Sequence, residues 1–212
     1  MISVVLADDH VVVRTGIKML LDADSDIEVV AEAAEGTEAY SLVARYKPDV
    51  LLLDISMPPG QSGLIACEKT AKDFPDTKVV ILTMFAEPEY LLYTLRGGAA
   101  GYVLKNSTPE QLRQAVHDVA NGGSYIHPTM VELLAKHAAG GSNDPSIQQL
   151  SSRELEILQL IARGHTNKEI SKMMFLSVKT VEAHRSKIYK KLHLKTRADA
   201  VDYALRHKLL DL

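Results

Sequence analysis

Short apolar runs alternate with longer amphipathic stretches along the first part of the chain. Five of these runs have the length and nearly continuous apolar character of strands that are buried on both faces, which is typical of a parallel sheet. They are Ser3–Ala7, Ile27–Ala31, Asp49–Leu53, Lys78–Leu82 and Ala99–Leu104. Because helical patterns fill the stretches between them, the sequence predicts a (βα)5 unit of the α/β class with right-handed crossovers.

The last helix of this series has a clear start. Thr108-Pro-Glu-Gln111 supplies an N-cap residue, a proline at the first helical position and a glutamine in the place that closes a capping box. We therefore expect a helix to begin at Pro109, directly after the fifth strand.

Toward the other end of the chain, the hydrophobic spacing becomes purely helical. Ser151 with Glu154, and Thr166 with Glu169, match the capping-box pattern, and Ser177 can cap a third helix. A fourth helix is expected over Thr196–His207. The pattern predicts a four-helix, all-α domain, with the first helix ending at a C-terminal glycine, Gly164.

The third of these helices, Val178–Leu192, has two different faces. Its apolar stripe consists of Val178, Val181, Ile188 and Leu192. A short helix, a tight turn and a second helix with an exposed cationic face form a helix-turn-helix, whose second helix enters the major groove of DNA. The residues assigned to double-stranded DNA are Lys179, Thr180, Glu182, Ala183, Arg185, Ser186, Lys187 and Lys190. The cations would mostly meet phosphates, and Glu182 and Ser186 could reach base edges. The plain alternative is a solvated charged face.

Composition separates the two patterns. Residues 138–146 are small, polar and contain Gly and Pro, which predicts a flexible connection. From Leu150 onward there are 13 Lys and Arg against 7 Asp and Glu, a net charge of +6; subtraction from the chain totals of 24 and 27 leaves −9 before it. An acidic part and a basic part suggest two domains with different partners, with nucleic acid for the basic one. The expected boundaries are 1–121, a linker over 122–147 that includes a helix, and 148–212.

The remaining composition excludes several classes of protein. The 212 residues are 46% hydrophobic, enough for globular domains, and no run approaches the roughly 18 apolar residues of a membrane span. The start of the chain lacks a basic segment and a cleavage site, so we expect a cytoplasmic protein with no membrane partner. Cys67 is the single cysteine, which excludes an internal disulfide and favours simple packing.

Five polar residues follow the ends of the predicted strands. Asp8 and Asp9 follow the first strand, Asp54 the third, Thr83 the fourth and Lys105 the fifth. Because the carboxyl ends of parallel strands meet at one edge, where doubly wound folds bind their ligands, we expect these side chains to lie close together.

This cluster has the composition of a phosphoryl-transfer site. Mg²⁺ is typically held by one or two carboxylates, waters and a phosphate, and an aspartate can attack a phosphoryl group to form an acyl phosphate. We assign Asp54 as the acceptor and Asp8 and Asp9 as Mg²⁺ ligands. Lys105 would pair with the phosphoryl group, and Thr83 would turn its hydroxyl onto a phosphoryl oxygen. For any one of these residues alone, a cap or turn is the commoner explanation.

The run Asp8-Asp9-His10, Asp54 followed by Ile-Ser-Met-Pro, Thr83 and Lys105 resemble the receiver domain of two-component response regulators. The resemblance implies a flavodoxin-like fold and phosphotransfer from a cognate sensor histidine kinase to Asp54 with Mg²⁺.

The same resemblance implies two further assignments. The backbone carbonyl of Ser56 becomes a metal ligand, and Tyr102 joins Thr83 as a switch pair that reorients on phosphorylation. One departure is the loop between Asp54 and Gly63, which is one residue longer than usual in the family. The lifetime of the acyl phosphate is therefore not transferable.

The helical part resembles a second family. Leu150-Ser-Ser-Arg-Glu-Leu, Asn167-Lys-Glu-Ile and Lys179-Thr-Val-Glu-Ala-His184 are similar to the LuxR/NarL/FixJ output domain. The order of domains implies a NarL-type transcription regulator that forms a homodimer when phosphorylated. The dimer residues implied by the fourth helix are Ala198, Val201 and Leu205, although such a stripe can equally be plain core.

A closer resemblance within the family rests on the segments Asp8–Gly16, Met57–Ala66 and Leu82–Phe85. It implies an activator of nitrate and nitrite respiration genes at low oxygen, which answers an oxygen-sensing kinase with an iron–sulfur cluster. With one cysteine, this chain cannot hold such a cluster itself.

Three alternatives remain open at this point. A phosphohydrolase that forms the same aspartyl phosphate would need a second carboxylate two residues after Asp54, where Ser56 stands. A flavin-binding module would need a phosphate-cradling loop, where Asp8 and Asp9 would repel an anion. A constitutive DNA-binding protein would bind DNA equally well with and without phosphorylation. We expect a regulator and not an enzyme, with any autodephosphorylation belonging to signalling.

Overall fold

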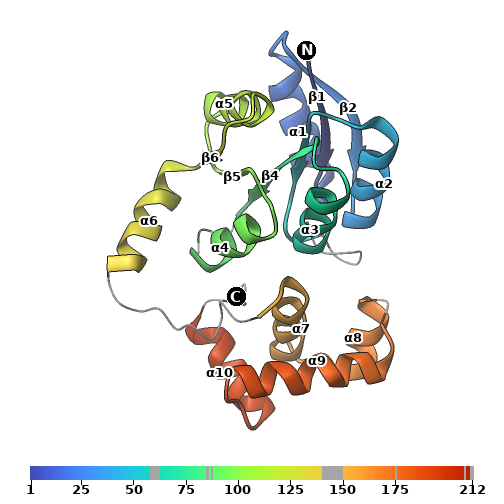
Figure 1. Cartoon of the computed structure of the whole chain (residues 1–212), viewed down its shortest axis with the longest axis vertical. Helices are drawn as coiled ribbons and strands as arrows, with labels where there is room; N and C mark the ends of the chain where they lie inside the picture. Colours follow the sequence, from blue (N-terminus) through green and yellow to red (C-terminus); the bar gives the residue numbers. More distant parts are fainter. Residues whose placement is uncertain are drawn as a thin grey trace. The chain divides into compact units, whose positions relative to one another are not determined.

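The first part of the chain folds around a parallel sheet (Figure 1). The computed structural model describes residues 1–57, 63–84, 86, 88–139, 150–174, 176–207 and 209–210. The expected strands are β1 (Ile2–Ala7), β2 (Ile27–Ala33), β3 (Val50–Leu53), β4 (Lys78–Thr83) and β5 (Gly101–Leu104). They pair in the order β2-β1-β3-β4-β5, with a further strand, β6, beyond β5. The predicted (βα)5 arrangement is confirmed, while residues 58–62 of the longer loop after Asp54 fall outside the described residues.

Helices cover both faces of this sheet (Figure 1). On one face lie α1 (Val11–Asp22) and α5 (Pro109–Ala120), and on the other α2 (Gly36–Tyr46), α3 (Gly63–Asp73) and α4 (Pro88–Arg96). Alternate strand residues such as Val4, Leu6 and Val80 pack with Ile17 and Val116 in one continuous core. Burial of both faces explains why the strands are almost uninterrupted apolar runs.

A short strand and a helix extend the sheet beyond the five predicted strands. β6 (Tyr125–Ile126) pairs in parallel with β5, where Tyr102 lies opposite Ile126. α6 (Pro128–Ala139) follows at once; it contacts α4, and its Met130 is fully buried. The stretch expected as a linker does include a helix, and the part up to α6 belongs to the first compact unit, Met1–Gly141.

The second compact unit, Ser142–Leu212, is helical in its described part. Its helices are α7 (Ser152–Ala162), α8 (Asn167–Met173), α9 (Val178–Lys191) and α10 (Arg197–Arg206). The capping boxes predicted at Ser151 and Thr166 are present, and the hydroxyl of Ser177 caps α9. Gly164 follows α7 with a φ of 102°, a backbone conformation that glycine adopts without strain.

Two helix faces of this unit differ from the expected pattern. Val178 is 39% exposed, although the apolar spacing placed it on the buried stripe of α9. It is the first residue of the helix and lines a surface hollow with Ile161 and Arg185, so the packed part of the stripe begins at Val181. On α10, Leu205 is 44% exposed while its neighbour Ala204 is buried, so Leu205 lies outside the core.

The sequence predicts a packing role for the single cysteine and no membrane span. Cys67 is buried in the interior and is a packing residue, and burial raises the pKa of its thiol to about 12. Among the described residues, no helix has both the length and the apolar character needed to cross a membrane.

Candidate functional site

The acidic residues meet at the point where the strand order reverses. β1 lies between β2 and β3, so the carboxyl ends of β1 and β3 form the crevice of a topological switch point. Ala7 lies opposite Leu53, and the Asp54 amide donates to the Ala7 carbonyl over 2.9 Å. Asp8 and Asp54 therefore leave neighbouring strand ends, and both are buried, with exposed fractions of 0% and 3%.

Lys105 reaches the same crevice from the end of β5. Its Nζ atom donates a hydrogen bond to Asp54 Oδ2 over 2.6 Å. The same atom lies 2.7 Å from Asp8 Oδ2, which makes an ion pair without the angle of a directed hydrogen bond. The Lys105 amide donates to the carbonyl of Thr83, which fixes the end of β5 against β4. One cation thus serves two buried carboxylates.

Burial and pairing oppose each other in the titration of these groups. Burial raises the pKa of Asp54 above its ordinary value, and the hydrogen bond from Lys105 and a weaker one from the Ser56 backbone offset this only in part. For Lys105, burial acts to lower the pKa, but the close contacts with Asp54 and Asp8 and the negative charges of these two residues outweigh it, and the pKa is raised. The lysine is therefore a cation at neutral pH, and its charge offsets those of Asp8 and Asp54.

Asp9 and His10 complete the acidic cluster. Asp8, Asp9, His10 and Asp54 each offer one ligand atom, and these atoms lie within 4.8 Å of one another. Asp8 Oδ1 accepts from the His10 amide, and the His10 ring lies 2.8 Å from Asp9 Oδ1. Within the described residues, the buried Asp9 Oδ1 makes no hydrogen bond. Carboxylate oxygens that are buried and incompletely satisfied fit a hard divalent cation such as Mg²⁺.

Thr83 and Tyr102 lie on one face of the sheet. Ile81 is opposite Tyr102 and Thr83 is opposite Leu104, so Thr83 and Tyr102 are diagonal neighbours on β4 and β5. Both are fully buried. Their register places the two side chains as neighbours on the same face of the sheet.

Gly63 is a residue whose importance sequence reasoning missed. A Cβ atom added to it would lie 1.8 Å from the Asp54 carbonyl oxygen, a distance that real Cβ atoms do not show. The Gly63 amide also donates to the Ile55 carbonyl over 2.9 Å. The start of α3 therefore touches the backbone that carries Asp54, and this requirement is set by tertiary contact, which no local pattern reveals.

We expect Gly63→Ala to displace the Asp54 backbone, to slow phosphorylation and to destabilise the first unit by about 1–3 kcal/mol, the usual cost of overpacking. Thermal unfolding and phosphorylation rates measure the two effects. Gly16→Ala on α1 is the matched control, because a Cβ there meets nothing within 4 Å. Equal behaviour of the two variants would contradict the steric argument.

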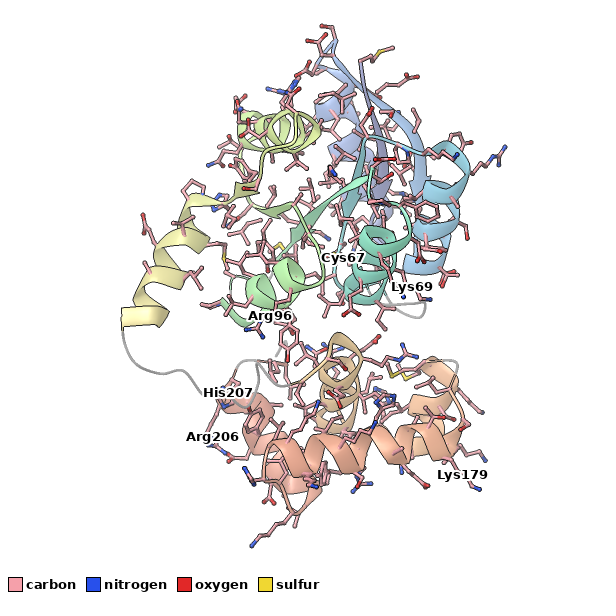
Figure 2. All side chains as sticks on the ribbon, in the orientation of Figure 1. Cys67, Lys69, Arg96, Lys179, Arg206 and His207 are labelled. Carbon is pink, nitrogen blue, oxygen red and sulfur yellow. The ribbon has the colours of Figure 1, made fainter. Side chains whose placement is uncertain are left out.

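The predicted DNA-contacting residues lie on the outer side of α9. Those that are exposed are Lys179, Glu182, Ala183, Ser186, Lys187 and Lys190. Figure 2 shows the Lys179 side chain directed away from the other helices of this unit. Two are partly covered: Arg185 lies over the ring of Tyr189, 5.0 Å from its centroid, and the hydroxyl of Thr180 lies 2.8 Å from that of Ser177. The exposed face thus mixes cations with one acid and two small residues.

On α10, the residues assigned to a dimer contact lie outside the core. Ala198 is exposed, Val201 is half-buried and Leu205 is exposed, while Ala200 and Tyr203 on the other side are buried. α10 packs against α7. The stripe is therefore accessible within its own unit.

Two family models match the chain, one in each compact unit. The response regulator receiver domain matches residues 4–117, and the LuxR family of bacterial regulatory proteins matches residues 148–204. The first range contains the acidic crevice and Lys105, and the second contains α7 to α9 and most of α10.

Relatives and solved structures match both units in the same order. Oxygen regulatory protein NreC of Staphylococcus carnosus (strain TM300) is 53% identical over 216 residues, and NreC of Staphylococcus aureus (strain JH9) is 52% identical over 215; each match covers 99% of both chains. RcsB from Salmonella enterica serovar Typhimurium, bound to promoter P1flhDC in the presence of phosphomimetic BeF3⁻, is 29% identical with a TM-score of 0.72, covering 100% of this chain and 99% of that one.

The first unit alone resembles the receiver domain of the putative response regulator NarL from Mycobacterium tuberculosis, which is 36% identical with a TM-score of 0.55 and covers 57% of this chain and 97% of that one. Both units thus match families of bacterial response regulators, and the two family models together span most of the chain. The chain belongs to the LuxR-type two-component response regulators, transcription regulators whose DNA binding depends on phosphorylation of the receiver domain.

Proposed function

We propose that Asp54 accepts a phosphoryl group from a cognate sensor histidine kinase, with Mg²⁺, and that the acyl phosphate controls promoter binding by α9. The observation that supports it most directly is the buried crevice in which Lys105 pairs with both Asp54 and Asp8. An Asp54 oxygen forms a bond to phosphorus as the bond from phosphorus to the kinase imidazole breaks, and the electron pair stays on the imidazole nitrogen.

The residues around Asp54 have separate tasks in this proposal. Asp8, Asp9 and the backbone carbonyl of Ser56 would hold Mg²⁺, which when bound supplies positive charge opposite the phosphoryl oxygens. Lys105 leaves its pair with Asp54 and binds a phosphoryl oxygen, because the acyl phosphate carries more negative charge than the carboxylate it replaces.

The switch uses the diagonal pair Thr83 and Tyr102 on β4 and β5. The Thr83 hydroxyl turns to donate to a phosphoryl oxygen, and Tyr102 changes its packing in response. The acyl phosphate thereby shifts a pre-existing equilibrium toward a form whose α9 is free for DNA and whose α10 stripe, Ala198, Val201 and Leu205, joins a second copy.

Exposed apolar residues of α1 offer a surface for the kinase. Val11, Val12 and Met19 are 64%, 85% and 69% exposed, on the helix that directly follows the acidic loop. Exposed apolar side chains next to a reactive group favour a docking surface, and a kinase that delivers a phosphoryl group to Asp54 must approach the acidic loop that precedes α1.

The similarity to proteins named oxygen regulatory protein supports oxygen as the signal to which this regulator responds. We propose that the target promoters include genes of nitrate and nitrite respiration, which the phosphorylated protein activates at low oxygen. Oxygen sensing is the task of the kinase, because the single Cys67 is buried and cannot hold an iron–sulfur cluster.

The proposal is tested by incubating the full chain with acetyl phosphate, with Mg²⁺ or with EDTA. We expect a hydroxylamine-labile phosphoryl group, mapped to Asp54 by peptide mass spectrometry, only with Mg²⁺. Footprinting should then show tighter and dimeric promoter binding by the phosphorylated protein. Modification elsewhere, or DNA binding that ignores phosphorylation, would reject the proposal; steady hydrolysis of phosphomonoesters would favour a phosphohydrolase.

Substitutions at two residues of α9 should have separate effects, one on DNA affinity and the other on base preference. Lys187→Ala should weaken binding to all promoter sequences and reduce the salt dependence by about one phosphate contact. Glu182→Ala should instead change the preferred bases, because a carboxylate accepts from cytosine. Binding titrations over a range of salt concentrations and a sequence-selection assay measure the two effects. Lys72→Ala, an exposed lysine on α3, is the control and should change neither.

A further inference from the structure

Arg14 contacts the backbone of the acidic loop from the first turn of α1. Its Nη1 atom donates a hydrogen bond to the backbone carbonyl of Asp8, and its Nε atom donates to Glu32 Oε2 on β2 over 3.1 Å. The Arg14 side chain is 15% exposed, so its position is constrained on most sides. The guanidinium therefore joins α1, the acidic loop and β2.

The carbonyl that Arg14 holds belongs to the peptide between Asp8 and Asp9. Because the peptide group is planar, fixing its oxygen fixes the plane that joins the Cα atoms of both residues. The other side of Asp8 is fixed as well: its amide donates to the Ala33 carbonyl over 3.1 Å, one step beyond the end of β1. Arg14 thus completes the restraint on the segment that carries the two acids.

Glu32 neutralises the positive charge of Arg14. An isolated guanidinium beside the acidic cluster would compete with a cation for the field of the carboxylates. The ion pair with Glu32 compensates the charge of Arg14 and orients its planar fork, in which separate N–H groups serve the carbonyl and the carboxylate. A lysine at this position could not make both contacts with one nitrogen in the same geometry.

We propose that Arg14, oriented by Glu32, is a positioning residue that holds Asp8 and Asp9 in the geometry for binding the divalent cation. The inference rests on the proposed function, because it assigns the cation site to these two acids. It predicts that Arg14 sets the affinity for Mg²⁺ without touching the cation or the phosphoryl group.

The experiment compares Arg14→Ala, Arg14→Lys and Glu32→Ala in the full chain. Isothermal titration gives the Mg²⁺ dissociation constant, and phosphorylation by acetyl phosphate is followed as a function of Mg²⁺ concentration. We expect Arg14→Ala to weaken Mg²⁺ binding about ten-fold, the lower end of effects from residues that support metal ligands. Saturating Mg²⁺ should restore most of the wild-type rate, and Arg14→Lys should restore part of the affinity.

Lys18→Ala is the matched control, because it removes an exposed ion pair, with Asp22, from the same helix. It should bind Mg²⁺ as the wild type does. Thermal unfolding in EDTA separates a loss of folding from a loss of affinity, and Glu32→Ala decides the question if Arg14→Ala does not fold. Wild-type affinity in a folded Arg14→Ala or in Glu32→Ala would overturn the inference alone, whereas a wild-type protein that neither binds Mg²⁺ nor becomes phosphorylated would overturn the proposed function as well.

Discussion

Lys105→Met is expected to destabilise the receiver unit by about 3–5 kcal/mol at pH 8 in EDTA, the usual cost of removing one partner from a buried charge pair. Lys105 is the cation within 2.7 Å of both Asp8 and Asp54, and both carboxylates are buried. Without it, two negative charges remain in a crevice with little water. Urea unfolding measures the loss, and Lys72→Met on the surface of α3 is the control.

The loss should depend on pH with a definite sign. Burial already raises the pKa of Asp54 above 3.8, and removal of Lys105 removes the main interaction that lowers it. A carboxyl with a raised pKa in the folded state is not destabilising below pH 3.8, and its penalty grows as the pH rises through the raised value. Lys105→Met should therefore lose less stability at pH 5 than at pH 8, and a loss that is equal at both would contradict this account.

Asp54→Asn should abolish the gain in DNA affinity that follows phosphorylation. The carboxamide cannot form an acyl phosphate, so acetyl phosphate and Mg²⁺ should leave the variant in its unmodified state. Coupling between two sites of one protein is usually worth a factor of about 5–150 in affinity, and the variant should lose this whole factor. Binding titrations with a promoter fragment measure it, with and without acetyl phosphate.

The matched control for this variant is Asp22→Asn, an exposed aspartate at the end of α1. It should keep both the modification and the gain in affinity. If Asp54→Asn bound DNA as tightly as the phosphorylated wild type and dimerised as readily, phosphorylation of Asp54 would not be the switch.

The sequence was most informative where local side chains determine local structure. Ser151, Thr166 and Ser177 marked helix starts because each hydroxyl satisfies a backbone amide within its own turn. The meeting of Asp8, Asp54 and Lys105 could also be expected, since strand order alone brings their strand ends to one edge.

Other features depend on contacts between distant segments and left no local pattern. β6 has two residues, and its pairing exists because β5 offers a free edge. The exposure of Val178 depends on how far the neighbouring helices extend, which periodicity cannot tell. Arg14 looked like any cation on an amphipathic helix, because its partners Asp8 and Glu32 lie on other elements. The assigned tasks of the individual site residues stay predictions until the variants are measured.

The pairing of β6 with β5 matters for any study of the isolated receiver. A fragment that ends at residue 121 would expose the backbone edge of β5 to solvent and uncover the surface on which Met130 is buried. Bare strand edges promote association between molecules, so such a fragment should be prone to aggregate. It would also lose the hydrogen bond from the His127 amide to the Tyr102 carbonyl. A fragment that ends at residue 139 keeps the whole sheet and is the better choice for crystallisation or spectroscopy.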